Sequence, residues 1–227
     1  MSRVWRRYTL TTVCLLAACA VAQSTSVPVA RRDLCVTNGV ISETGTGAML
    51  IESASSRAIA PNTDGRSAEL RFRYLGRSAD TKPLASGELR QQIGLKLRSM
   101  NQCNLLYVMW HIEPDSKLAV LIKSNPGQHT HGDCGARGYA TIKSATDVRP
   151  PKPVAGEWHV LRAELKGMEL TVTADGAAAW RGTLPQTLLS IDGPAGIRSD
   201  NARFAFTLSA GAVPARSVTG CRSEAGD

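Results

Sequence analysis

The chain has 227 residues, of which 43% are hydrophobic, 20% charged and 5% aromatic, and its formal net charge is +8 at neutral pH. This composition excludes an intrinsically disordered chain and a polytopic membrane protein, and the length suits one globular domain with a full core. The positive charge does not predict a nucleic-acid partner, because the sequence has no dense run of Lys and Arg and few aromatic residues for base stacking.

The first 22 residues have the pattern of a secretory signal peptide. Three arginines form a basic start, and an apolar run from Val13 to Ala22 ends in small residues. The run is shorter than the ~20 apolar residues that a membrane span needs. Residues 16–19 (Leu-Ala-Ala-Cys) resemble the lipobox of bacterial lipoproteins, which implies lipidation of Cys19, whereas residues 20–22 resemble an ordinary signal-peptidase site. Both alternatives predict export, either as a lipoprotein of the periplasm or outer membrane or as a secreted protein.

Residues 23–33 are small, polar or proline, which predicts a tether between a membrane anchor and a folded domain at residues 34–221. The dominant pattern in that domain is an alternation of apolar and polar residues, as in half-buried strands. Residues 69–74 and 89–98 alternate in this way. Residues 105–112 are apolar on both faces, which suits a central strand under a second layer.

Further strands are predicted along the rest of the chain, and Asp175-Gly176 is the best hairpin turn because both residue types tolerate a positive φ. A second turn is expected at Lys166-Gly167. No stretch shows a sustained apolar stripe at helical spacing. We therefore predict an all-β, two-sheet antiparallel sandwich, as in a jelly roll. The further predicted strands are 118–123, 139–143, 159–165, 169–174, 177–180 and 203–208.

The C-terminal third carries Gly156-Glu-Trp158, the Asp175-Gly176 turn and Gly193-Pro-Ala-Gly196-Ile197. This run resembles the end of concanavalin-A-like and laminin-G-like sandwiches, including secreted bacterial domains described as 3-keto-disaccharide hydrolase-like. The resemblance covers residues 154–208 and implies the same jelly-roll fold. Because this fold hosts lectins, adhesion modules, glucanases and lyases, the resemblance implies no single activity.

Four cysteines lie beyond the signal peptide, and an even number in an exported chain predicts two disulfides. Three pairings are possible. On the assumed sandwich fold we favour Cys35 with Cys221, which joins the two ends, and Cys103 with Cys134, which pins a long loop. The spacings do not match a zinc site.

In sandwiches of this kind, the concave face of one sheet commonly receives sugars. Guanidinium groups match carboxylates bidentately and a glutamine amide matches hydroxyls, so a row of such side chains would suit an acidic polysaccharide. The same alternation also fits the ordinary solvated side of a sheet. The candidate binding residues are Arg71, Arg73, Gln92 and Lys96, with Trp110 or His111 as a stacking edge.

A second polar group lies in the loop at residues 125–134. His129, His131 and Asp133 could bind a divalent metal or act as a base with its orienting acid. The alternative is a polar surface loop held by the Cys134 disulfide. We expect no cofactor, with a structural calcium ion left open.

The sequence matches known catalytic motifs only in part. Sandwich glucanases of the laminarinase kind carry E-x-D-x-x-E, but here Glu113-Pro-Asp115 is followed by Leu118 in place of the third acid. Jelly-roll alginate lyases carry Q-I-H, and the corresponding Gln92-Ile-Gly94 lacks the histidine.

These observations predict an exported, non-catalytic, lectin-like envelope module with a glycan partner and, through Cys19, a membrane anchor. One alternative is a carbohydrate-active enzyme, such as a polysaccharide lyase or a glycosidase, that acts on acidic or keto sugars. The other alternative is a structural or protein-binding lipoprotein.

Overall fold

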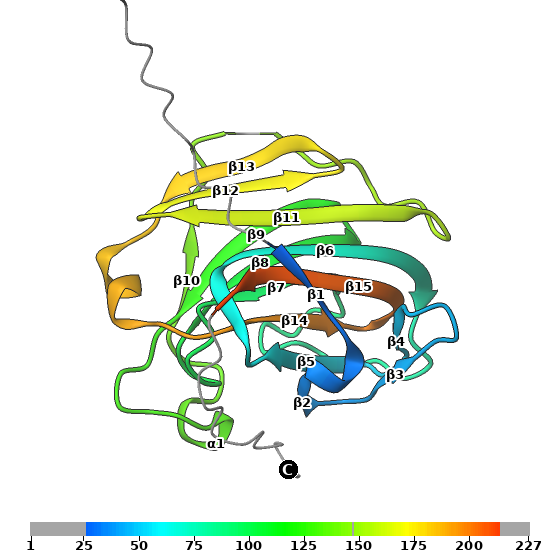
Figure 1. Ribbon diagram of the computed structural model, residues 1–227, viewed down its shortest axis with the longest axis horizontal. Helices are drawn as coiled ribbons and strands as arrows, with labels where there is room; N and C mark the ends of the chain where they lie inside the picture. The colour runs from blue at the N-terminus through cyan, green and yellow to red at the C-terminus, as the bar shows by residue number, and fades with distance from the viewer. Residues whose placement is uncertain (1–25, 147, 214–227) are drawn as a thin grey trace, which may run out of the picture.

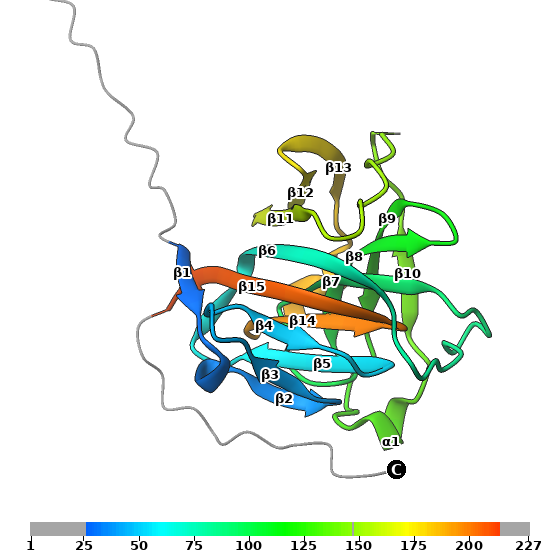
Figure 2. The same ribbon diagram turned by 90° about the vertical axis from the view of Figure 1, so that its right-hand side faces the viewer.

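A computed structural model describes residues 26–146 and 148–213, in which two antiparallel sheets pack face to face (Figures 1 and 2). The eight-stranded sheet has the order β13-β12-β11-β6-β15-β4-β3, and its remaining strand, β1, pairs with β15. The seven-stranded sheet has the order β10-β9-β8-β7-β14-β5-β2. The predicted two-sheet antiparallel sandwich is confirmed.

The two sheets are built from short and medium strands, and three short helical segments lie between strands. The strands of the eight-stranded sheet are β1 (Ser26–Val29), β3 (Ile41–Glu43), β4 (Met49–Ile51), β6 (Thr63–Arg77), β11 (Trp158–Lys166), β12 (Glu169–Ala174), β13 (Ala177–Thr183) and β15 (Ala202–Ala212). The strands of the seven-stranded sheet are β2 (Cys35–Asn38), β5 (Ser55–Ala60), β7 (Gln91–Leu97), β8 (Leu105–Glu113), β9 (Lys117–Lys123), β10 (Tyr139–Ile142) and β14 (Ala195–Asp200). The helical segments are η1 (Arg31–Asp33), α1 (His131–Cys134) and η2 (Gln186–Ser190).

The core forms where the apolar faces of the two sheets meet. Alternation along β6 turns Leu70 and Phe72 inward, and both are fully buried. The Phe72 ring meets the Trp110 ring of β8 edge to face, with centroids 5.5 Å apart, so one aromatic pair joins the two layers. No helix within the two described ranges is long and apolar enough to cross a membrane.

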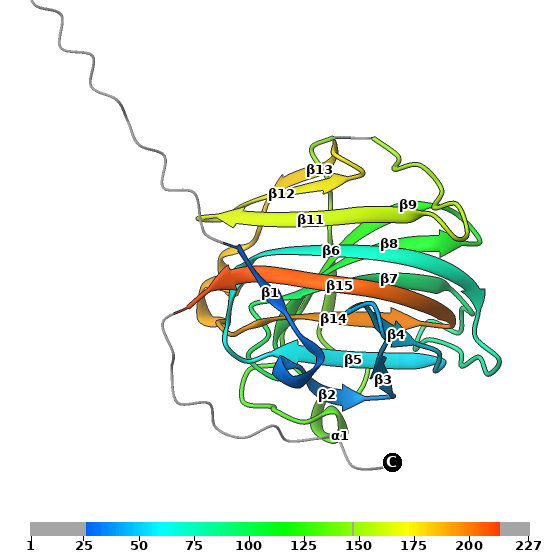
Figure 3. The ribbon, with the colours of Figure 1, turned by 45° about the vertical axis from the view of Figure 1, so that its right-hand side comes forward.

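The structure contains each predicted strand, although β6 (15 residues) is much longer than the predicted strand at 69–74. The Asp175-Gly176 turn joins β12 to β13 with both residues at positive φ. The segment expected as a tether differs from the prediction. Residues 26–29 form β1, which pairs with β15 from Leu208 to Gly211. Figure 3 shows β1 lying against β15. The backbone groups of residues 26–29 therefore belong to the sheet, and the folded domain begins earlier than residue 34.

The predicted disulfide between Cys103 and Cys134 is confirmed, and its Cα atoms are 5.9 Å apart. It holds the loop that carries α1 against the start of β8. The other predicted bridge has one end, Cys221, outside the described residues. The signal peptide and Cys19 also lie outside them.

Candidate functional site

The face of the seven-stranded sheet that points away from the core carries a row of polar and aromatic side chains. Strand alternation puts Ile93, Leu95 and Leu97 of β7 in the core, so Gln92 and Lys96 point the other way. The register then places side chains of the neighbouring strands beside them on the same face. We call this set the cationic face: Arg57, Gln92, Lys96, Tyr107, His111, Lys117, Lys123, Tyr139, Arg198 and Asp200.

The structure separates the residues that the sequence grouped as one site. Gln92, Lys96 and His111 lie together on the cationic face, since β7 pairs Gln92 with His111. Arg71 and Arg73 lie on the outer face of the other sheet, where both guanidinium groups pack on the Trp158 ring, at 5.2 and 4.8 Å from its centroid.

Trp110 also differs from the prediction. It is adjacent to His111 on β8 and therefore points to the opposite side of the sheet, into the core, with none of its surface exposed. Its indole nitrogen donates a hydrogen bond to the Ser116 hydroxyl at 3.2 Å. Trp110 is thus a core residue and offers no stacking edge to a ligand.

Asp200 is the centre of the hydrogen bonds on the cationic face. Its carboxylate accepts from Gln92 Nε2 at 2.7 Å and from Arg198 Nε at 2.8 Å. Burial is the largest single influence and lowers the pKa of Arg198, but the Asp200 carboxylate together with Tyr107 and Tyr139 outweighs it, and the pKa lies above its ordinary value. These contacts fix three side chains from two adjacent strands in one arrangement.

Two tyrosines extend the cationic face toward its edge. The Tyr107 and Tyr139 rings stack with centroids 6.1 Å apart, the Arg198 guanidinium lies 5.1 Å from the Tyr107 centroid, and Lys123 Nζ lies 5.2 Å from that of Tyr139. Burial raises the pKa of Tyr107 to about 12, although the charge of Arg198 opposes the shift. Tyr139 is 39% exposed, so part of its side chain stays accessible at this edge of the sheet.

His111 lies at the other end of the cationic face. Its Nε2 atom is 3.2 Å from the Arg90 guanidinium, which Glu88 contacts in turn. Burial, followed by the charges of Arg90 and Lys117, lowers the pKa of His111 to about 3. The imidazole is therefore neutral at physiological pH.

In the polar loop that the sequence offered as a metal site, the Asp133 side chain has a structural role. The Asp133 carboxylate accepts from the Thr130 backbone and hydroxyl at 3.0 and 2.8 Å, which caps α1, and these hydrogen bonds lower the pKa of Asp133. His129 faces the Asn101 amide. Residues 26–146 and 148–213 contain no group of three or more side chains placed to hold a metal ion, His131 included.

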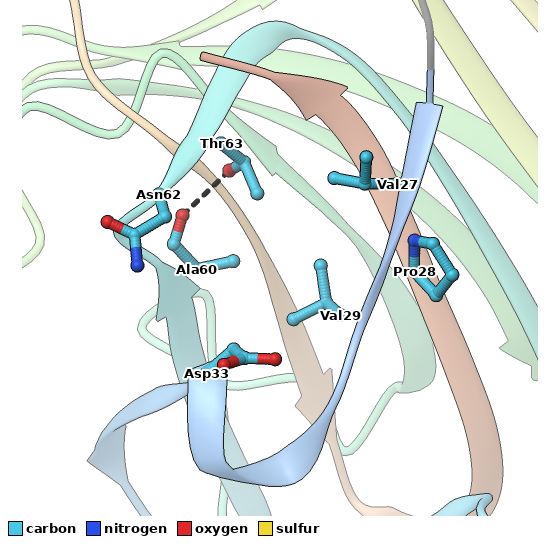
Figure 4. Close-up of a pocket in the computed structure, with 7 residues that line it drawn as sticks. All are labelled: Val27, Pro28, Val29, Asp33, Ala60, Asn62 and Thr63. Carbon is cyan, nitrogen blue, oxygen red and sulfur yellow. Dashed lines mark hydrogen bonds between the residues drawn. The ribbon is translucent and has the colours of Figure 1, made fainter. Parts of the chain in front are cut away.

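Two cavities lie beside the sheets. One of about 140 Å³ is lined by β1, η1 and the turn between β5 and β6, where the Thr63 hydroxyl donates to the Ala60 carbonyl (Figure 4). The other is an open depression of about 510 Å³ beside the ends of β6, β7 and β8. Its lining includes Arg90, so it borders the His111 end of the cationic face.

Sequence reasoning missed Arg198, Asp200 and Tyr107, although Arg198 and Asp200 form the hydrogen bonds of the cationic face and Tyr107 stacks on Tyr139. A signal for the first two was present, because Gly196-Ile-Arg-Ser-Asp200 alternates with the period of a strand. Tyr107 lay in a run that is apolar on both faces, where periodicity assigns no side.

The fold is similar to that of solved structures at low sequence identity. A carbohydrate-binding module from Bacillus subtilis matches with a TM-score of 0.53 and 14% identity, over 77% of this chain and 91% of that one. A predicted glycosyl hydrolase from Parabacteroides distasonis matches with a TM-score of 0.51 and 9% identity, over 82% of this chain and 90% of that one. No family model and no curated protein matches the sequence. The narrower resemblance to 3-keto-disaccharide hydrolase-like domains stays a prediction.

Proposed function

We propose that this protein binds acidic glycans through the cationic face and does not cleave them. The observation that carries the proposal is the fixed row of Gln92, Asp200 and Arg198 beside the stacked tyrosines. Preorganised polar groups next to an aromatic surface are what a ligand site requires, because they lose little entropy when they bind. The fold likeness to a carbohydrate-binding module supports the same class of ligand.

The charge of the cationic face favours an acidic ligand. Its one carboxylate, Asp200, already pairs with Arg198. Arg57 is half-buried and Lys117 is exposed on the same face, so these two side chains add accessible positive charge beyond that pair. An anionic sugar would gain charge-assisted hydrogen bonds there, whereas a neutral sugar would gain only the weaker neutral ones.

The acid and base groups of the cationic face are suited to binding a glycan and not to cleaving it. A retaining glycosidase needs two carboxylates about 5 to 5.5 Å apart, and Asp200 is the single carboxylate within the cationic face. A lyase needs a base that titrates near neutral pH. The pKa of Tyr107 is about 12 and that of His111 is about 3, so neither side chain is poised to take a proton there.

A binding titration with alginate and polygalacturonate, and with neutral dextran for comparison, tests this proposal. Both polyuronates should bind at low salt and weaken several-fold at about 0.5 M salt, where the Debye length falls below 5 Å, while dextran should not bind. Equal affinity for dextran, or release of unsaturated uronates that absorb ultraviolet light, would overturn the proposal.

Variants at the exposed edge locate the site without disturbing the buried row. Lys117→Gln and Tyr139→Ala should each weaken polyuronate binding several-fold, since one removes a charge and the other a stacking surface. Arg71→Gln is the matched control, because it removes an exposed charge from the opposite sheet. If Arg71→Gln weakened binding as much as Lys117→Gln, the site would lie elsewhere.

We also propose that the protein is exported and anchored by a lipid on Cys19. Its Cys103–Cys134 disulfide supports export, because disulfides persist in oxidising compartments. Cell fractionation of the full chain and of Cys19→Ser is the test. The full chain should remain with the envelope membranes, and the variant should become soluble or stay unprocessed. Membrane retention of a processed Cys19→Ser protein would refute the anchor.

A further inference from the structure

Two buried polar atoms at the His111 end of the cationic face have no hydrogen-bond partner among the described residues. They are Gln92 Oε1 and His111 Nδ1. The two residues are directly opposite each other on β7 and β8, and each is 3% exposed. A buried polar group without a partner is unfavourable, so two on neighbouring residues call for a partner from outside.

The Asp200 carboxylate fixes which way the Gln92 amide points. A carboxylate only accepts hydrogen bonds, so it must face the NH₂ group of the glutamine, at 2.7 Å. The other amide atom, Oε1, is therefore the one without a partner, and it can only accept a hydrogen bond.

The Arg90 guanidinium fixes the tautomer of His111 in the same way. Arginine has donors and no acceptor, so the His111 Nε2 atom that faces it at 3.2 Å must accept. The ring is neutral, since its pKa is about 3, and the proton therefore resides on Nδ1. The unpartnered Nδ1–H group can only donate.

An unpaired acceptor and an unpaired donor thus lie on directly opposite residues. A hydroxyl group both donates and accepts, so one hydroxyl can satisfy both atoms. A carboxylate or a sulfate could accept from His111 but has no proton to give Gln92. The open depression is lined by Arg90, whose guanidinium contacts His111, and by Gln91, which directly precedes Gln92, so a ligand in it would lie beside the residues that flank this pair.

We propose that Gln92 and His111 bind one sugar hydroxyl and so determine which glycans the cationic face accepts. This inference rests on the proposed function and adds to it. The cations would bind the acidic group of the sugar, and the Gln92–His111 pair would select for a free hydroxyl.

Chemical O-acetylation of polygalacturonate provides the test, because it blocks hydroxyls and leaves the carboxylates intact. The wild-type protein should bind the acetylated polymer at least about tenfold more weakly than the parent, since a site built around a hydroxyl rejects an analogue that lacks it. Gln92→Met and His111→Phe should each lower affinity for the parent and bind the two polymers about equally. Ser199→Ala is the matched control. It removes a buried unpartnered hydroxyl from the core side of β14, and it should keep the wild-type discrimination.

Histidine ¹⁵N chemical shifts provide a second measurement that needs no variant. The free protein should show His111 protonated at Nδ1, and a trigalacturonate should shift that resonance when it binds. An Nε2–H tautomer, or binding without a shift at Nδ1, would overturn the inference even if Gln92→Met failed to fold.

The outcomes separate the two proposals. If the wild-type protein binds neither polymer, the proposed function fails and the inference fails with it. If it binds both with equal affinity, or if the variants still discriminate as the wild type does, then glycan binding stands and the hydroxyl site is refuted.

Discussion

Acidification should destabilise this protein through His111 over a defined pH range. Burial and the charges of Arg90, Lys117 and Arg198 disfavour the imidazolium, while Asp200 favours it, and the net effect lowers the pKa from 6.5 to about 3. The folded state therefore stays unprotonated where the unfolded state takes up a proton. Between these two pKa values the unfolded chain binds more protons, so the free energy of unfolding falls as the pH falls.

The size of this effect follows from the shift. Each pH unit between the two pKa values changes the free energy of unfolding by about 1.4 kcal/mol, so a change from pH 6.5 to about pH 4 costs roughly 3 kcal/mol. A domain whose unfolding free energy is about 5–15 kcal/mol would lose a substantial part of its stability. The stabilisation by neutral His111 is complete above pH 6.5 and disappears as the pH approaches 3.

Urea unfolding at a series of pH values, for the wild type and for His111→Gln, measures this effect. Glutamine retains a polar side chain and has no proton to take up, so the variant should lose roughly 3 kcal/mol less than the wild type over the same range. The difference between the two proteins removes the contribution of the carboxylates, which titrate in both. Parallel pH dependences for the two proteins would show that His111 is not held neutral by its surroundings.

Further substitutions test the packing by urea unfolding. A Cβ at Gly94 would lie 2.2 Å from a carbonyl oxygen of β8, so Gly94→Ala should lower the free energy of unfolding by roughly 3 kcal/mol or more. Gly45→Ala is the control: no atom lies within 4 Å of the new Cβ, so the free energy of unfolding should change by no more than about 0.5 kcal/mol. Replacing Cys103 and Cys134 by alanine opens a loop with a sequence separation of 31 and should cost roughly 3–4 kcal/mol. Phe72→Ala leaves a cavity between the sheets and should cost about 3–5 kcal/mol. A loss of less than about 1 kcal/mol of unfolding free energy at Gly94, Phe72 or the cysteine pair would contradict the packing described for that position.

The sequence predicted the strands from β6 onward because each long strand repeats its pattern over several residues. The short early strands gave too few repeats for a period to be recognised, as in β3, which has three residues. β14 was recognised only as part of the Gly193–Ile197 motif and not as a strand, although its residues alternate. Its polar residues, which complete the candidate site, were therefore left unassigned.

The sequence could not assign strands to sheets, so it grouped side chains that the structure places on two different sheets. Alternation indicates which residues of one strand share a face, so it grouped Arg71 with Arg73 and Gln92 with Lys96 correctly. It contains no information on which sheet a strand joins. β6 lies in one sheet and β7 in the other, and the two pairs therefore face opposite sides of the protein. Only the pairing of strands far apart in sequence, such as β14 with β7, shows which side chains meet.

The same pairing explains how long cationic side chains can be buried on a face that points away from the core. Arg198 lies directly opposite Gly94, and Lys96 lies directly opposite Gly196, so each cation has a neighbour without a side chain. Both glycines also lie so close to the backbone of the next strand that a Cβ would meet a carbonyl oxygen at 2.2 Å. The absence of side chains at these two positions leaves room for the cations to lie along the sheet, packed and held in place rather than extended into solvent. Cations fixed in this way lose little side-chain entropy when an anionic ligand binds, which is the physical reason to place the glycan site on this face and not beside the more exposed Arg71.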